Sequence, residues 1–154
     1  FFKFCSFNLQ KKYKGGLIMG CRGQVKIKDN YGDGSVYLYT HWGAEELKED
    51  VALALARRKR WTDSEYLARI IFDQMKGNDV GHLSFGIGTS EQGGIEELIT
   101  IDTKKQEISW WENYGCGENS EWECCSFEEY VEKHKSFIDE CTTKNELFIK
   151  EEEE

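Results

Sequence analysis

The sequence predicts an α+β fold: a mostly antiparallel sheet of about five strands, in the order ββ-αα-βββ-α, with helices packed on one face. Two observations lead to this prediction. Some segments alternate apolar and polar residues, which is typical of half-buried strands, and others repeat apolar residues at helical spacing. The strand-like segments are joined by short turn-rich stretches and the helix-like segments form separate blocks, which indicates hairpins and an α+β arrangement.

The expected strands cover residues 24–28, 35–42, 83–87, 98–102 and 107–112. The first two should form a hairpin, because residues 29–34 are dense in Asp, Asn and Gly. In the second strand both faces are apolar. One face carries Val36, Leu38, Thr40 and Trp42, and the other carries Tyr37, Tyr39 and His41. The pattern therefore leaves open which face is buried.

The expected helices cover residues 45–60, 62–76 and 127–141. The second should begin with a capping box at Thr62-Asp63-Ser64-Glu65, and the third with one at Ser126 and Glu129. The first helix has acids at its start and Arg57, Arg58, Lys59 and Arg60 at its end, and both placements complement the helix dipole.

The 154 residues are enough for one domain, expected at 19–141, followed by an acidic tail at 142–154. Residues 1–18 contain lysines but no acid. Lys14-Gly15-Gly16, just before Met19, is what a purine-rich ribosome-binding site gives when it is translated. We therefore expect residues 1–18 to be a translated leader and Met19 to be the native start.

Composition and charge exclude some function classes. The formal net charge of −9 disfavours nucleic acid as a partner, because phosphate contacts need a basic surface, but it leaves open a basic protein partner. No apolar run approaches the roughly 20 residues of a membrane span. The six irregularly spaced cysteines favour reduced thiols and a cytoplasmic location over a disulfide framework.

Several segments resemble a known group of proteins: Met19-Gly20-Cys21-Arg22-Gly23, then residues 36–43 with the block Tyr39-Thr40-His41-Trp42-Gly43, then Arg60-Trp61, residues 66–72 and residues 85–89. Together they resemble a group of small proteins of prokaryotes and their phages that have no established activity. The likeness covers about two thirds of the chain after Met19. Because it begins at Met19, it also supports that start. It implies no functional residue.

The most interesting local feature is His41-Trp42-Gly43, where a strand ends and a helix is about to begin. Unpaired backbone groups make such a place suitable for a site, and the imidazole could act as a base or bind an anion. In the alternative, Trp42 closes the end of the core beside a hydrogen-bonded His41. Tyr37, Tyr39 and His41 on one face could form a stacking platform for a ligand, or could be core covered by helices.

The other candidates have plainer explanations. Arg57 to Arg60 could bind phosphate or an acidic partner, but they also suit a helix C-terminus. The residues whose types could suggest a zinc site are Cys116, Cys124, Cys125, His134 and Cys141. Their spacing does not match paired zinc ligands, so we expect no metal, and no motif indicates a cofactor.

The function expected from the sequence is a small non-enzymatic binding or accessory protein of phage or mobile-element type. It would act on a host protein, or on a small anionic ligand near His41, Arg57 and Arg60. The alternative is a small hydrolase or nuclease-like enzyme using His41 with Arg22 and a carboxylate, Asp33 or Glu45, and a third possibility is a structural component. Convergence of His41, Arg22 and a carboxylate within hydrogen-bond reach would favour the enzyme.

Overall fold

The computed structural model describes residues 21–112 and 121–144. The expected leader at 1–18, Cys116 and most of the acidic tail lie outside the described residues. Within them, no helix is long and apolar enough to cross a membrane.

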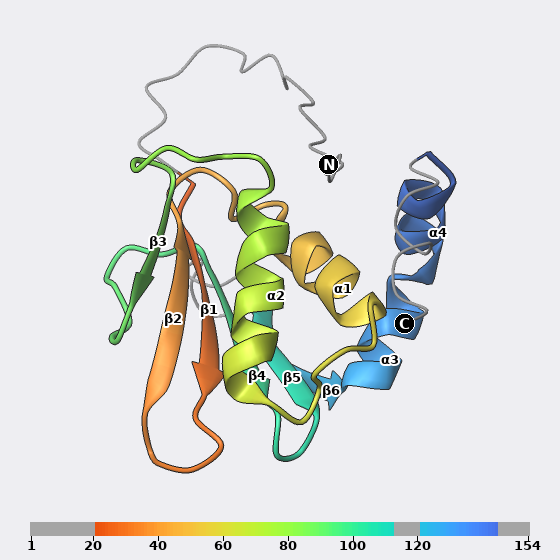
Figure 1. The fold of residues 1–154 in the computed structure, drawn as a ribbon, viewed down its shortest axis with the longest axis horizontal. Helices are drawn as coiled ribbons and strands as arrows, with labels where there is room; N and C mark the ends of the chain where they lie inside the picture. The colour runs from red at the N-terminus through yellow and green to blue at the C-terminus, as the bar shows by residue number, and fades with distance from the viewer. Residues whose placement is uncertain (1–20, 113–120, 145–154) are drawn as a thin grey trace.

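The described chain forms a sheet flanked by helices (Figure 1), which confirms the α+β class. The sheet has six strands in the order β3-β2-β1-β4-β5-β6. Their bounds are β1 Gly23–Lys28, β2 Ser35–Thr40, β3 Phe85–Gly88, β4 Glu97–Asp102, β5 Glu107–Glu112 and β6 Glu121–Ser126. β1 and β4 pair in parallel and every other neighbouring pair is antiparallel.

The sheet thus differs from the expected one by a sixth strand and a parallel pair. The parallel pair arises because β3 returns to the outer side of β2, so β4 must cross to the free side of β1. The extra strand, β6, has the sequence EWECCS, which alternates polar and apolar residues only over Glu121–Cys124, and its side chains are exposed or half-buried. Four alternating residues give only a weak strand signal.

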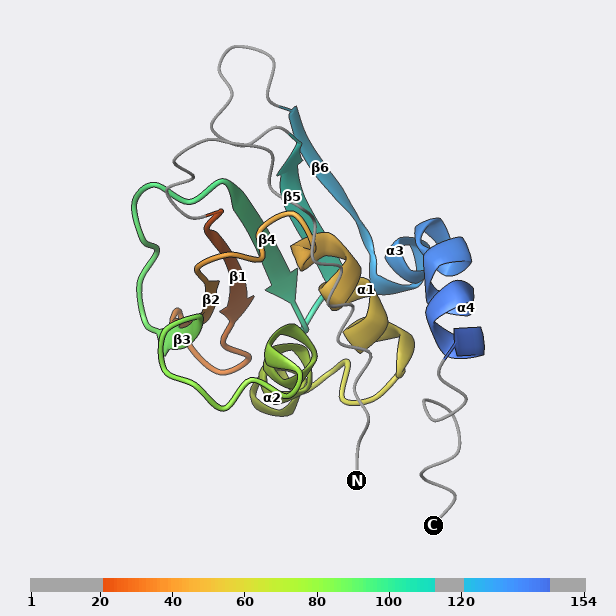
Figure 2. The same cartoon turned by 90° about the horizontal axis from the view of Figure 1, so that it is seen from above.

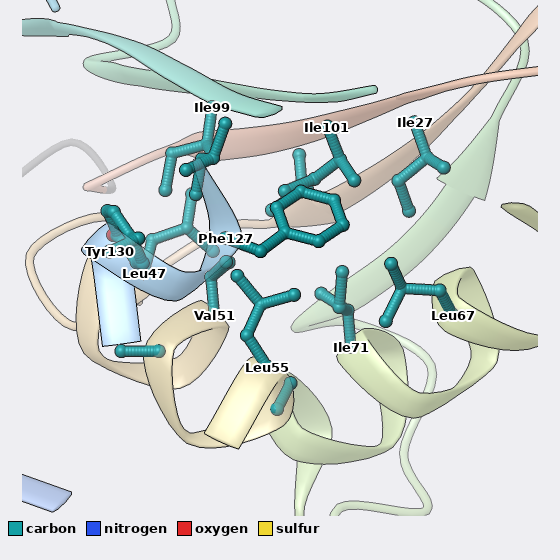
Figure 3. Close-up of a cluster of buried hydrophobic side chains, with 14 of the residues drawn as sticks. Ile27, Leu47, Val51, Leu55, Leu67, Ile71, Ile99, Ile101, Phe127 and Tyr130 are labelled. Carbon is teal, nitrogen blue, oxygen red and sulfur yellow. The ribbon is translucent and has the colours of Figure 1, made fainter. Parts of the chain in front are cut away.

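The helices are α1 Leu47–Ala56, α2 Ser64–Lys76, α3 Phe127–Lys133 and α4 Lys135–Lys144. They lie on one side of the sheet, as expected (Figure 2). Between the layers is a core of fully buried apolar side chains (Figure 3). The sheet contributes Val25, Ile27, Leu38, Ile99, Ile101 and Ile108, and the helices contribute Val51, Leu55, Leu67, Ile71, Phe127 and Tyr130. Each such side chain stabilises the fold by about 1.5–3 kcal/mol relative to exposure.

The structure shows which face of β2 meets the helices. Leu38 and Thr40 are buried on the helix-covered face, where Leu38 is paired with Val25 of β1. Tyr37 and Tyr39 alternate with them and lie on the opposite face.

α1 is shorter than the expected helix at 45–60. The chain leaves helical geometry after Ala56, and Arg58 and Arg60 have φ angles of 54° and 59°, in the left-handed region, where a right-handed helix cannot continue. The cap of α2 is Asp63, not Thr62: its carboxylate accepts from the backbone N–H groups of Glu65 and Tyr66. The capping box of Ser126 and Glu129 is present. The single helix expected at 127–141 is interrupted at His134, the C-cap of α3.

Candidate binding site at the end of strand β2

The segment after β2 is held in a defined shape by its backbone. The N–H of Gly43 donates to the hydroxyl of Thr40 at 3.0 Å, and the N–H of Ala44 donates to the carbonyl of Cys21 at 3.1 Å. A Cβ on Gly43 would lie 2.9 Å from the Thr40 Oγ1 that accepts its N–H, so this turn favours glycine. His41 and Trp42 therefore sit on a fixed loop between β2 and α1.

His41 is held by contacts on three sides. Its backbone N–H donates to the carbonyl of Ser84 at 2.8 Å, and its Nδ1 lies 2.9 Å from the Tyr39 hydroxyl. Its ring meets the Trp42 ring edge-on, with 4.3 Å between the centroids. These contacts fix the imidazole and place the indole beside it.

Trp42 is 51% exposed, so it does not close the core as the alternative expectation had it. Thr40 pairs with Phe85, and the hydrogen bond from His41 to Ser84 continues this pairing by one residue. Leu83, the residue before Ser84, is 78% exposed. We call Trp42 and Leu83 the Trp42 patch. In Figure 1 the loop leaving β2 and the connection from α2 to β3 meet at the upper end of the sheet.

Carboxylates surround the thiol of Cys21 at this end of the sheet. The thiol lies 3.3 Å from a carboxylate oxygen of Glu96, whose backbone N–H donates to the carbonyl of Arg22 at 2.7 Å. Burial, then the hydrogen bond and charge of Glu96, with a further contribution from the charge of Glu45, raise the pKa of Cys21 to about 11. The thiol therefore stays protonated at neutral pH and is a poor nucleophile.

The residues of the enzyme hypothesis are brought together only in part. Gly23 pairs with Thr40, so the register places Arg22 opposite His41, and Glu45 lies beside Cys21. Within the described residues, however, no hydrogen bond or ion pair joins Arg22 to His41. Asp33 lies in the turn at the far end of β2, about 20 Å away along the strand. Asp33 therefore does not belong to this site.

The basic cluster lies elsewhere, at the opposite end of α1, about 15 Å from the start of that helix. The Arg57 guanidinium donates to Gln74 at 3.1 Å. That of Arg58 donates to both carboxylate oxygens of Glu128, at 2.5 and 2.7 Å, and Arg60 stacks over the Tyr66 ring. These contacts connect α1 to α2 and α3. The structure does not bring Arg57 and Arg60 together with His41 around one small anion.

The two tyrosines of the proposed stacking platform also differ in their surroundings. Tyr37 is only 9% exposed, and the ammonium group of Lys26 lies 5.8 Å from its ring centroid. Tyr39 is half-buried and positions His41. Because Tyr37 is buried, its ring is not an open surface on which a base could stack.

The described part of the chain contains no group of three or more His, Cys, Asp or Glu side chains that could hold a metal ion. Cys124 and Cys125 are neighbours on β6 and so point to opposite faces of the sheet. Within the described residues, Cys21, Cys124 and Cys125 are free thiols.

Leu83 and the pair of Cys21 and Glu96 were missed by the sequence analysis. Leu83 was interpreted as the first residue of a strand, whereas β3 begins at Phe85 and Leu83 remains in the exposed connection. Cys21 and Glu96 are far apart in sequence and meet only because β1 and β4 are adjacent and parallel.

Comparison of the chain with protein-family models, curated proteins and solved structures finds no match.

Proposed function

We propose that this chain is a small non-enzymatic binding protein that contacts another protein through the Trp42 patch. The observation that carries the proposal is the exposure of Trp42 and Leu83, two large apolar side chains on adjoining, hydrogen-bonded segments. Burial of each would be worth roughly 1.5–3 kcal/mol, and the fold itself does not gain that energy. A partner that covered both side chains would gain that energy on binding.

The order of the loop supports the same proposal. Trp42 contacts a His41 ring that Tyr39 and Ser84 hold in place, and Gly43 and Ala44 fix the backbone that follows. A surface that is already ordered loses little conformational entropy on binding. Tryptophan is also among the residues that most often dominate the energy of protein interfaces.

The resemblance to prokaryotic and phage proteins supports a host protein as the partner and an accessory role as the function. The free thiols support a cytoplasmic location. The enzyme alternative has less support, because Asp33 is remote, Arg22 makes no hydrogen bond to His41, and burial and Glu96 keep the thiol of Cys21 protonated.

Affinity capture tests the proposal. We expect the tagged chain to retain a protein from a lysate of its own cells, and the Trp42→Ala/Leu83→Ser variant to lose it. Tyr31→Ala/Trp122→Ala is the matched control, since it removes two other exposed aromatic side chains. Equal retention by both variants would contradict the assignment of the surface.

A further inference from the structure

We infer that the partner segment covering the Trp42 patch carries lysine or arginine side chains beside apolar ones. This inference rests on the proposed function and adds the chemistry of the partner. The apolar part of the segment would cover Trp42 and Leu83. Its cations would face the carboxylates that border them, and one could lie over the Trp42 indole, the best side-chain acceptor for a cation–π contact.

The border of the patch is acidic. Glu45 and Glu46 are exposed and follow Trp42 in the turn before α1. Glu96 is exposed just before β4, two strands from β2, and is held beside Cys21. An acidic border would attract a basic segment and repel an acidic one, which is how charge complementarity selects a partner.

Among the described residues, the cations at this end are few and partly engaged. Lys48 lies 3.8 Å from a carboxylate oxygen of Glu97, and the ammonium group of Lys76 donates to the carbonyl of Gly77 at 3.4 Å. Arg22 is half-buried. Within residues 21–112 and 121–144, the exposed charge beside Trp42 is therefore mainly negative.

Two titratable groups report the same local field. Burial is the main cause of a raised pKa at Asp50, and the charges of Glu46 and Glu49 raise it further. Burial and Glu96 likewise raise the pKa of Cys21.

Short labelled peptides test this inference by fluorescence anisotropy at low salt. One alternates leucine with arginine, a second alternates leucine with glutamate, and a third alternates serine with arginine. We expect the leucine–arginine peptide to bind most tightly. Trp42→Ala should weaken its binding about tenfold, as removal of a central tryptophan does.

Charge variants supply the matched comparison. Glu45→Gln/Glu46→Gln should weaken the leucine–arginine peptide about fivefold, and added salt should reduce this difference. Glu65→Gln/Glu132→Gln changes the net charge equally, on exposed residues of α2 and α3, and should have less than about a twofold effect. Thermal melts would confirm that each variant is folded.

Equal weakening by the two charge pairs, or equal binding of the leucine–glutamate peptide, would overturn the inference. The affinity-capture experiment tests the proposed function separately. If Trp42→Ala/Leu83→Ser loses the captured protein, those peptide results contradict only this inference. If that variant keeps the captured protein, the proposed function is contradicted, independently of the peptide results.

Discussion

Cys21 shows how single residues define the chemistry of this site. Its thiol is partly buried and faces Glu96, so the protonated form is favoured in the folded chain. A pKa raised from 9.0 to about 11 contributes stability that is fully present below pH 9.0 and is lost as the pH rises towards about 11. Around neutral pH the thiol contributes packing and a hydrogen bond rather than reactivity.

Glu96→Gln should therefore make Cys21 react faster. The substitution removes the carboxylate charge that opposes thiolate formation, so the pKa of Cys21 should fall. Alkylation of Cys21 by iodoacetamide at about pH 8 should then be several-fold faster. Peptide mapping by mass spectrometry follows each thiol separately. Cys124 is the internal control, because its raised pKa comes from burial and Glu107. An unchanged rate at Cys21 would show that Glu96 does not set its pKa.

At the residue scale the sequence predicted part of the site. His41 and Trp42 were recognisable from their place between a strand pattern and a helix pattern. The exposure of Trp42 was not predictable from the sequence, because it depends on where β3 pairs and on what covers the end of the core. Tyr39 and His41 share a strand face, so their contact could be predicted from the sequence. The contact between Cys21 and Glu96 could not be predicted in this way.

The start of α1 packs closely against the start of β1. A Cβ added to Gly23 would lie 2.9 Å from Leu47 Cδ2 and 3.2 Å from Ala44 Cβ. Leu47 is fully buried and cannot easily move aside. This contact fixes the beginning of α1 relative to the loop that carries Trp42.

Gly23→Ala should consequently destabilise the protein by about 1–3 kcal/mol, the usual cost of overpacking a core. Gly34→Ala is the matched control, because an added Cβ there meets nothing within 4 Å. It should be neutral or slightly stabilising, since alanine restricts the unfolded chain. Urea denaturation measures both. A Gly23→Ala variant as stable as the Gly34→Ala variant would mean that α1 shifts without cost.

At the scale of elements, strong periodicity predicted α2, β1, β2, β4 and β5. The ends were less predictable. α1 stops at Ala56 because Arg58 and Arg60 adopt left-handed backbone geometry. Arg58 contacts Glu128, which is distant in sequence, and Arg60 contacts Tyr66, which belongs to the next helix. β6 has only a short alternating pattern, and as an edge strand it is fixed by its pairing with β5.

For the whole molecule, the fold separates two regions that the sequence analysis had joined. The Trp42 patch and its acidic border lie at one end of α1, and the arginines that connect the helices lie at the other (Figure 1). Because of this separation, one small anion cannot contact both regions. The separation does not affect the proposed protein-binding surface, the Trp42 patch at the upper end of the sheet.

The most direct test is photo-crosslinking from the patch in the native cells. A benzophenone amino acid replaces Leu83 in one variant and Tyr31, at the opposite end of β2, in another. We predict a crosslinked partner from position 83, lost when Trp42→Ala is added, and none from position 31. Crosslinking of the same partner from position 31 alone, or from position 83 regardless of Trp42, would contradict the claim.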